Sequence, residues 1–398
     1  MGAMPEQAIK DKTAIVGIGW TAFSRQSGTT ALNLALEASL KAIDDAGLSP
    51  KQIDGVFTHF HKHADTAAPR EMVHGLGLEK CNFEVFNSGG GSWNCSAVMT
   101  AASLVFAGVV NYALLYRAMN RYSEGRGTRA RRADDVSGDD QFRIPFGNHH
   151  AAATFGHVAT AHMAKYGTTS LDFAHLAVTE REHALLNTKA MMRPKGPITI
   201  EDHQNSRWIV YPFRLLDCCQ ETDGAVAMVI TTAERARDLK QTPVHIMSGV
   251  GGSGPTRGLW ETNAANAAPL LYGGAGVTPK DVDFAEIYDP FTLMCLTHIE
   301  DYGLVEKGGV ADWVREGHNK LDGSCPVNTH GGLLSEAHIH GQNHVIEAVQ
   351  QLRPQGVVDD LCEGPHTYDR SVCRQVRNPE IGLVCGESGG SSMLLRRG

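Results

Sequence analysis

The sequence lacks any apolar run of the length that spans a membrane, and its first residues, MGAMPEQAIKDK, lack the apolar core of a secretory signal. An excess of basic residues is also missing, because 36 Lys and Arg stand against 44 Asp and Glu, for a formal net charge of −8. This balance favours neither a nucleic acid nor an anionic membrane as a partner. We therefore expect neither among the partners of this chain.

The sequence also lacks any CxxC pair. Its nine cysteines are odd in number and scattered, at positions 81, 95, 218, 219, 295, 325, 362, 373 and 385. This spacing fits a reducing cytoplasm better than a disulfide scaffold. Adjacent cysteines in an extended chain point apart and make a poor pair of metal ligands, so Cys218 and Cys219 are interpreted as small buried side chains.

What the chain does have is a regular order of short apolar runs and helical patterns over 398 residues, enough for one or two α/β cores. Strands are expected at Thr13–Gly17, Ile53–Phe57, Phe83–Phe86, Asn111–Tyr116 and Ala225–Thr231, and helices at Leu32–Ile43 and Asn94–Ala107. This alternation predicts a parallel or mixed sheet covered by helices.

One nonapeptide occurs twice, as AGLSPKQID at Ala46–Asp54 and as AGVTPKDVD at Ala275–Asp283, and each copy lies between a helix and a strand. We therefore predict two similar α/β halves, residues 1–240 and 241–398. Within the first half, the regular order of strands and helices is lost at about 118–212, and we expect an inserted loop domain there. Loops at corresponding strand ends converge in such a protein, and ligands prefer these crevices.

Four loops at these strand ends carry polar or glycine-rich sequence: Ser88–Ser92, Ile287–Phe291, Thr329–Gly341 and Cys385–Ser391. The glycine turn opens a helix whose free N–H groups could face a developing negative charge, or could be a tightly packed turn. Tyr288 could transfer a proton or simply pack. The histidines of THGGLLSEAHIHG suit proton transfer, with metal binding as the competing interpretation, and HFHKH (His59, His61, His63) leaves a zinc site open.

Together these motifs resemble the thiolase superfamily, in particular the branch related to the sterol-carrier-protein-X thiolase domain. LLDCCQETDGAVAMVIT resembles that branch's CCPxSDGAAA segment, and AEIYDPF stands where thiolases carry NEAF or HDCF. GGLLSEAHIHG matches the GGxxxxGHPxG loop, and CGESGG matches the C-terminal CxGGG loop. The resemblance covers nearly the whole chain and implies the thiolase fold, with two duplicated halves in an αβαβα arrangement of layers.

Thiolases attack an acyl-CoA with a cysteine at the start of the Ala-rich helix. Aligning Ala97 and Gly108 with that helix puts Gly91 at the nucleophile position, and Cys95 lies a helical turn too far along. The lipid-transfer-protein-type aldolases of bacterial steroid side-chain catabolism likewise lack the cysteine and carry YD in place of NE. The resemblance to this subgroup implies retro-aldol cleavage of a β-hydroxyacyl-CoA without a covalent intermediate. Some steroid aldolases have a second tyrosine at the position of His338.

The resemblance also implies roles for the site residues. Tyr288 is the expected base for the β-hydroxyl, assisted by Asp289 or a nearby histidine, and His338 is expected to stabilise and reprotonate the enolate. Backbone N–H groups at Gly91 and around Gly389 would complete an oxyanion site, and a glycine at 91 would leave room for a branched substrate carbon. Supporting roles are expected for His330, His340 and Cys385.

The same resemblance implies no cofactor beyond the CoA of the substrate, no metal, a homodimer, and a small OB-fold/zinc-ribbon protein as a partner in a hetero-oligomer. Two alternatives stay open. The protein could be a thiolase or acyltransferase that uses Cys95 or Cys385. It could also be a non-catalytic subunit that binds acyl-CoA.

Overall fold

The computed structural model describes the chain except residues 1–5, 62–65, 124–136 and 363–367. The strands are β1 (Thr13–Trp20), β2 (Gly55–Phe60), β3 (Phe83–Ser88), β4 (Ala113–Asn120), β5 (Trp208–Val210), β6 (Phe213–Arg214), β7 (Asp223–Thr232), β8 (Val244–Gly251), β9 (Phe284–Glu286), β10 (Ile381–Cys385) and β11 (Ser391–Arg397). The helices are α1 (Ala31–Asp45), α2 (Pro69–Gly75), α3 (Asn94–Phe106), α4 (Ala151–Tyr166), α5 (Ser170–Leu185), α6 (Ile200–Asn205), α7 (Ala233–Ala236), α8 (Ala264–Ala275), α9 (Thr292–Asp301), α10 (Val310–Arg315) and α11 (Gln342–Leu352).

Nine strands pair in the order β3-β2-β4-β7-β1-β8-β11-β10-β9, with β5 and β6 forming a separate hairpin. Strands β3, β2 and β4 are parallel to one another, as are β9 and β10, whereas β7 and β11 run antiparallel to their neighbours. The junction between β1 and β8 consists of the two residue pairs Ala14–His245 and Ile15–Val244. The predicted mixed α/β fold is confirmed.

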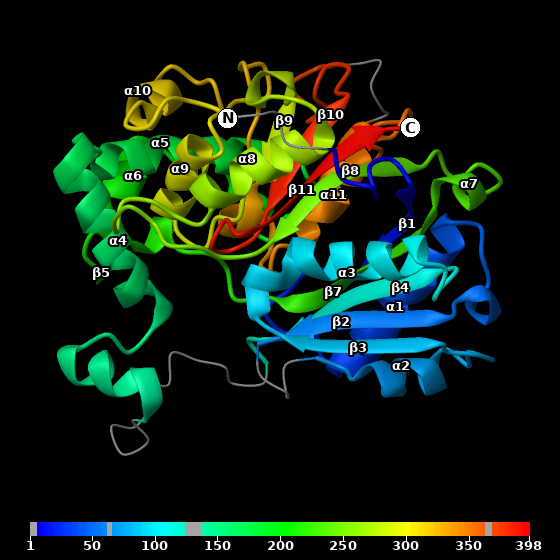
Figure 1. Ribbon diagram of the computed structural model, residues 1–398. Coiled ribbons are helices and arrows are strands. Elements are labelled where there is room, and N and C mark those ends of the chain that lie inside the picture. The colour runs from blue at the N-terminus through cyan, green and yellow to red at the C-terminus, as the bar shows by residue number, and fades with distance from the viewer. Residues whose placement is uncertain (1–5, 62–65, 124–136, 363–367) are drawn as a thin grey trace.

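The helices form layers around these strands. Helices α3 and α11 contact strands on both sides of the β1–β8 junction, and Figure 1 shows α3 between the lower strands β2 and β4 and the upper strands β8 and β11. Helix α1 packs on β1, β7 and β4, and α8 packs on β8 and β11. One apolar core joins Val98 of α3 and Val345 of α11 to strand residues from distant parts of the chain, such as Leu115 and Leu395. Helices α3 and α11 therefore form a central layer that joins the two ends of the sheet.

Glycines in β1 allow α1 to approach the sheet closely. A Cβ atom added to Gly17 would lie 2.1 Å from the carbonyl oxygen of Ala42, and one added to Gly19 would lie 2.3 Å from that of Ala38. Helix α1 itself begins where the side chain of Thr30 accepts a hydrogen bond from the N–H of Asn33, which satisfies a free donor of the first turn. The buried face of α1 is rich in alanine, because the helix and β1 lie too close together for larger side chains.

The two copies of the nonapeptide adopt the same local structure. Gly47 and Gly276 follow α1 and α8 with φ angles of +74° and +70°, which glycine adopts without strain. Each is followed by a 3₁₀ turn closed by a capping box, Pro50–Gln52 in one copy and Pro279–Asp281 in the other, and then by β2 or β9. The prediction that the chain divides at residues 240 and 241 stays a prediction.

Helices α4, α5 and α6 and the β5–β6 hairpin lie between β4, which ends at Asn120, and β7, which begins at Asp223. Helix α5 contacts α9, α10 and the segment Gly332–Glu336. The inserted part of the chain therefore supports the loop that follows residue 329.

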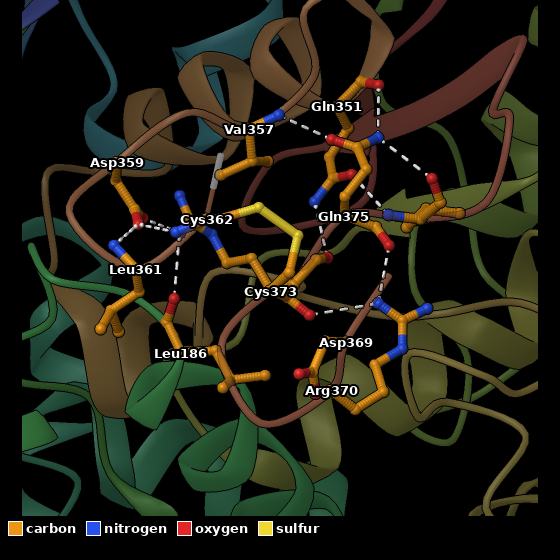
Figure 2. Close-up of a disulfide and its surroundings, with 12 residues drawn as sticks. Leu186, Gln351, Val357, Asp359, Leu361, Cys362, Asp369, Arg370, Cys373 and Gln375 are labelled. Carbon is orange, nitrogen blue, oxygen red and sulfur yellow. Dashed lines mark hydrogen bonds and ion pairs between the residues drawn. A yellow bond between two sulfur atoms is a disulfide. The ribbon is translucent and has the colours of Figure 1, made fainter. Parts of the chain in front are cut away.

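The cysteine prediction was wrong at one place, because Cys362 and Cys373 form a disulfide (Figure 2). The guanidinium of Arg370 donates to the carbonyl oxygen of Cys373, and the carboxylate of Asp359 accepts from the N–H of Cys362. These contacts bring together two cysteines that are 11 residues apart, a spacing that no framework motif marks. The other seven cysteines are free.

No helix in the described ranges combines the length and the apolar character that crossing a bilayer requires.

Candidate active site

The four loops singled out from the sequence meet at one end of the sheet. Gly91, after β3, and Gly386, after β10, are adjacent, since a Cβ atom at Gly386 would lie 2.7 Å from the carbonyl oxygen of Gly91. Tyr288 follows β9 and contacts Gly91 and Gly341, which begins α11. All of these residues are buried. The convergence of these loops produces a polar cluster inside the protein.

The centre of this cluster is a hydrogen bond between the hydroxyl of Tyr288 and Nε2 of His338, 2.9 Å apart. The two side chains come from different loops and are 1% and 4% exposed. Burial raises the pKa of Tyr288 well above its ordinary value, and the nearby Glu387 and Cys219 act in the same direction. Tyr288 is therefore a neutral phenol in the resting protein.

Gly91 is the residue that makes room for this phenol. A Cβ atom at position 91 would lie 2.0 Å from the Tyr288 hydroxyl oxygen and 2.3 Å from Cζ of the ring. The expectation that the glycine leaves room for a substrate carbon is therefore wrong for this conformation, because the tyrosine occupies that space. The side chain of Tyr288 stands against the position where thiolases hold their nucleophile.

Asp289 was expected to assist Tyr288, but its carboxylate contacts a different loop. Its carboxylate accepts hydrogen bonds from the N–H groups of Leu333 and Leu334 and lies 3.2 Å from Nε2 of His344. Burial raises the pKa of the adjacent Glu180, and the negative charge of Asp289 acts in the same direction. Asp289 thus holds the loop that carries His338.

Two arginines at the end of β4 face the histidines of that loop. The Nη1 of Arg121 is 3.1 Å from Nδ1 of His338, and Arg117, which is fully buried, contacts Nδ1 of His340 through Nε and Nη2 at 3.2 and 3.0 Å. Cys219 Sγ lies 3.4 Å from the same Nδ1 of His338. Burial and the charge of Arg117 lower the pKa of His340 well below its ordinary value, which keeps its ring neutral.

Gly389 and the cysteines fit their expected roles less well. The N–H of Gly389 donates to the carbonyl oxygen of Gly386 at 2.9 Å, so this N–H is engaged in the turn and is not turned toward an oxyanion. Burial raises the pKa of Cys385 to about 12 and that of Cys95 well above its ordinary value. Buried thiols of this kind are inert as nucleophiles, which argues against the thiolase alternative.

Comparison with known proteins is consistent with this arrangement. The chain is 42% identical over 362 residues to the 17-hydroxy-3-oxo-4-pregnene-20-carboxyl-CoA lyase of Mycobacterium tuberculosis, an alignment that covers 87% of this chain and 92% of that protein. The chain belongs to the thiolase-like aldolases. It is also 39% identical to the steroid side-chain-cleaving aldolase of Thermomonospora curvata, over 85% of this chain and 90% of that protein.

Solved structures give the same family. The structure described as the Ltp2-ChsH2(DUF35) aldolase superposes with a TM-score of 0.87 and 36% identity, covering 98% of this aldolase and 99% of that chain. Residues 255–364 match the family described as thiolase C-terminal domain-like. Human mitochondrial 3-ketoacyl-CoA thiolase, at 15% identity and a TM-score of 0.68, over 99% of this chain and 100% of its own, shares the fold.

Sequence reasoning missed three residues of this aldolase that contact the loop histidines. Arg117 lies in β4 and Arg121 follows directly after the strand ends at Asn120. A basic residue within an otherwise apolar buried strand was the available signal. Cys219 gave no such signal, because its contact with His338 depends on how two distant loops pack.

The other histidines of this aldolase fall into two groups. His59 and His61 have ring centroids 6.1 and 6.2 Å from that of His340, and His63 lies outside the described residues. His330 lies farther back, with Nδ1 2.9 Å from the carboxylate of Glu286 and its ring 4.8 Å from that of His344. Of the supporting residues that the sequence predicted, His340 is therefore the one beside His338.

Glu286, His330 and His344 are the described residues that could hold a metal ion, since their ligand atoms lie within 4.8 Å of one another. Burial alone would lower the pKa of His330, but the carboxylates of Glu336 and Glu286 outweigh it and raise the pKa to about 9. A protonated imidazole has no lone pair for a metal. The absence of a metal from the reaction stays a prediction.

The His330–Glu286 pair predicts how stability depends on pH. The folded-state pKa of His330, about 9, lies above the unfolded value of about 6.5, so this contribution is fully present below pH 6.5 and is lost as the pH rises through 9. We expect a loss on the order of 2–3 kcal/mol across that window. Thermal melts from pH 6 to 9.5 should show a smaller decline for His330→Asn, while the exposed control His157→Asn should follow the wild type. Equal slopes for His330→Asn and the wild type would contradict this account.

A cavity of about 710 Å³ lies beside the loop that carries His338. Met191 lines the cavity, and its sulfur accepts a hydrogen bond from the hydroxyl of Thr222. The Thr222 oxygen in turn accepts the backbone N–H of His338 at 2.9 Å. The remaining walls combine apolar side chains with basic ones, namely Trp20, Phe23, Met192, Arg25, Lys41 and Lys195.

Proposed function

We propose that this protein cleaves a carbon–carbon bond of a β-hydroxyacyl-CoA thioester by a retro-aldol reaction, giving a ketone or aldehyde and a shorter acyl-CoA without an acyl-enzyme. The observation that carries the proposal is the Tyr288–His338 hydrogen bond, whose phenol fills the space beside Gly91 where a thiol nucleophile would stand. The lyase and aldolase names of relatives at 42% and 39% identity support it.

A retro-aldol cleavage needs one proton to leave the β-hydroxyl and one proton to reach the α-carbon. The carbon–carbon electron pair moves toward the thioester, which gains enolate character, while the two protons are transferred. Tyr288 takes the hydroxyl proton as it gives up its own phenolic proton, and His338 supports its oxygen through the 2.9 Å hydrogen bond. N–H groups at the turn that contains Gly91 are our candidates for the enolate oxygen, and such donors are typically worth roughly 3 kcal/mol each. Asp289 acts by holding the loop.

The substrate is proposed to be an acyl-CoA with a bulky, steroid-like acyl group. The 710 Å³ cavity next to Met191 has the size of a ligand site, and its apolar walls suit such a group. Its basic residues suit the phosphates of CoA. The reaction as proposed uses no cofactor other than that CoA.

The proposed assembly is a homodimer that also binds a small OB-fold/zinc-ribbon protein. Strand β3 lies at the edge of the sheet in Figure 1, and Phe83 on it is 41% exposed, so the edge could pair with a second copy. The solved relative described as the Ltp2-ChsH2(DUF35) aldolase supports a partner of this kind. We also propose a cytoplasmic location.

The decisive experiment offers the full chain, with and without proteins encoded beside it, a β-hydroxyacyl-CoA that bears a steroid ring system. Mass spectrometry should detect the ketone or aldehyde and the shortened acyl-CoA, with the intact protein mass unchanged. An acyl adduct on Cys95 or Cys385 would indicate the acyltransferase instead. Tight binding of the thioester with no product in any combination would indicate a non-catalytic subunit.

A further inference from the structure

The contact between Arg121 and His338 determines how the catalytic histidine holds its proton. A guanidinium group has only N–H donors and no acceptor, and it stays charged in proteins. The Nδ1 of His338, 3.1 Å from Nη1 of Arg121, must therefore be the acceptor of that hydrogen bond. We propose that Arg121 is a positioning residue that fixes His338 as the neutral tautomer with its proton on Nε2. This inference rests on the proposed function.

The other groups around His338 favour the same tautomer. The Cys219 sulfur lies 3.4 Å from Nδ1, and because burial raises the pKa of that thiol to about 12, it stays protonated and can donate weakly. The backbone N–H of His338 is already engaged with Thr222. Among the described residues, the titratable and charged groups near the ring include Arg121 after β4, Cys219 before β7, Tyr288 after β9, and His340 on the same loop with Arg117 behind it. Glu387, from the loop after β10, acts through its charge on both Tyr288 and Cys219.

The position of this proton sets the direction of the central hydrogen bond. With its proton on Nε2, His338 donates to the Tyr288 oxygen at 2.9 Å and has no lone pair there to receive the phenol proton. The Tyr288 O–H is then turned away from His338 and is free to donate to the substrate. His338 is therefore a hydrogen-bond donor in this mechanism and not the base that deprotonates tyrosine.

The two proton transfers can then both pass through the Tyr288 oxygen. One lone pair of that oxygen accepts the His338 N–H, and the other accepts the proton of the β-hydroxyl. The phenol gives its original proton to the α-carbon of the enolate as the carbon–carbon bond breaks. Tyr288 ends the cycle with the proton it took from the substrate, so protons balance and the residue never carries a full negative charge.

Nitrogen-15 NMR of the full chain labelled at histidine tests this directly. The signal of His338 is assigned by its disappearance in His338→Gln. In the wild type we expect Nδ1 to have the shift of a bare ring nitrogen and Nε2 that of an N–H. In Arg121→Gln the two tautomers should mix and the ring should gain a second proton at higher pH, whereas Arg121→Lys, which retains a cationic donor, should restore much of the wild-type pattern. The exposed control Arg237→Gln should leave the signal unchanged.

Kinetics give a second measurement. We expect Arg121→Gln to lower kcat by about tenfold or more and to add an acidic limb to the pH profile of kcat/KM near the ordinary histidine pKa of about 6.5. A proton on Nδ1 in the wild type would overturn the inference, and this measurement depends on the His338→Gln assignment but on no Arg121 variant and no known substrate. If the tautomer is as expected but no β-hydroxyacyl-CoA is cleaved, the proposed function fails while the role of Arg121 in setting the tautomer stands.

Discussion

Replacing Tyr288 with phenylalanine is expected to lower kcat for carbon–carbon cleavage by about 10²–10⁴-fold, the range for loss of a positioned proton-transfer group. The ring of the phenylalanine fills the same space against Gly91 and Gly341, so the fold and the binding of the CoA thioester should change little. The measurement is product release under saturating substrate, together with a dissociation constant for a non-cleavable thioester analogue.

Tyr116→Phe is the matched control for that variant. Tyr116 is also fully buried, and its hydroxyl donates to the carbonyl oxygen of Ala67 at 2.7 Å, within the core packed around α1. Its loss should lower stability by about 1–3 kcal/mol because a buried carbonyl loses its partner, with kcat unchanged. Wild-type turnover by Tyr288→Phe, or an equal loss in both variants, would refute the catalytic role of Tyr288.

Gly91→Ala should be nearly as damaging, although alanine is the smallest possible change. The added methyl would lie 2.0 Å from the Tyr288 hydroxyl, so the phenol has to move and its 2.9 Å hydrogen bond to His338 is lost. We expect kcat to fall by about 10²-fold or more, since a misplacement of about 1 Å suffices for that loss. Overpacking should also lower the free energy of unfolding by about 1–3 kcal/mol.

Gly252→Ala provides the comparison, because a Cβ atom there meets nothing within 4 Å. Its activity should equal that of the wild type, which would exclude a general effect of replacing glycine near the β8 end of the sheet. Retention of full activity by Gly91→Ala would show that Tyr288 does not need its present position.

Much of the fold could be predicted because its elements follow local patterns. The apolar run at Thr13–Gly17 became β1, and the helical face from Leu32 to Ile43 became α1 with Gly47 as its left-handed stop. The glycine at position 91 could also be interpreted from the sequence, since a missing nucleophile is visible once a helix is aligned. Each of these features is encoded within one short segment, so it can be predicted without knowledge of the tertiary contacts.

The errors concern contacts between segments. Asp289 is next to Tyr288 in the sequence, yet its carboxylate binds the N–H groups of Leu333 and Leu334 on another loop. The N–H of Gly389 is engaged inside its own turn, and Cys362 forms a disulfide with Cys373 at a spacing that matches no framework motif. The side chains of consecutive residues at the end of a strand point to opposite sides, so residues adjacent in the sequence need not act in the same site.

The close approach of Gly91 and Tyr288 also limits how this gene can exchange parts with its relatives. The two residues lie on different predicted halves, so recombination near residue 240 would inherit them separately. A first half that carried a side chain at position 91 would put its Cβ 2.0 Å from the phenol oxygen encoded by the second. A side chain at position 91 is therefore compatible with this packing only if Tyr288 is replaced or moves.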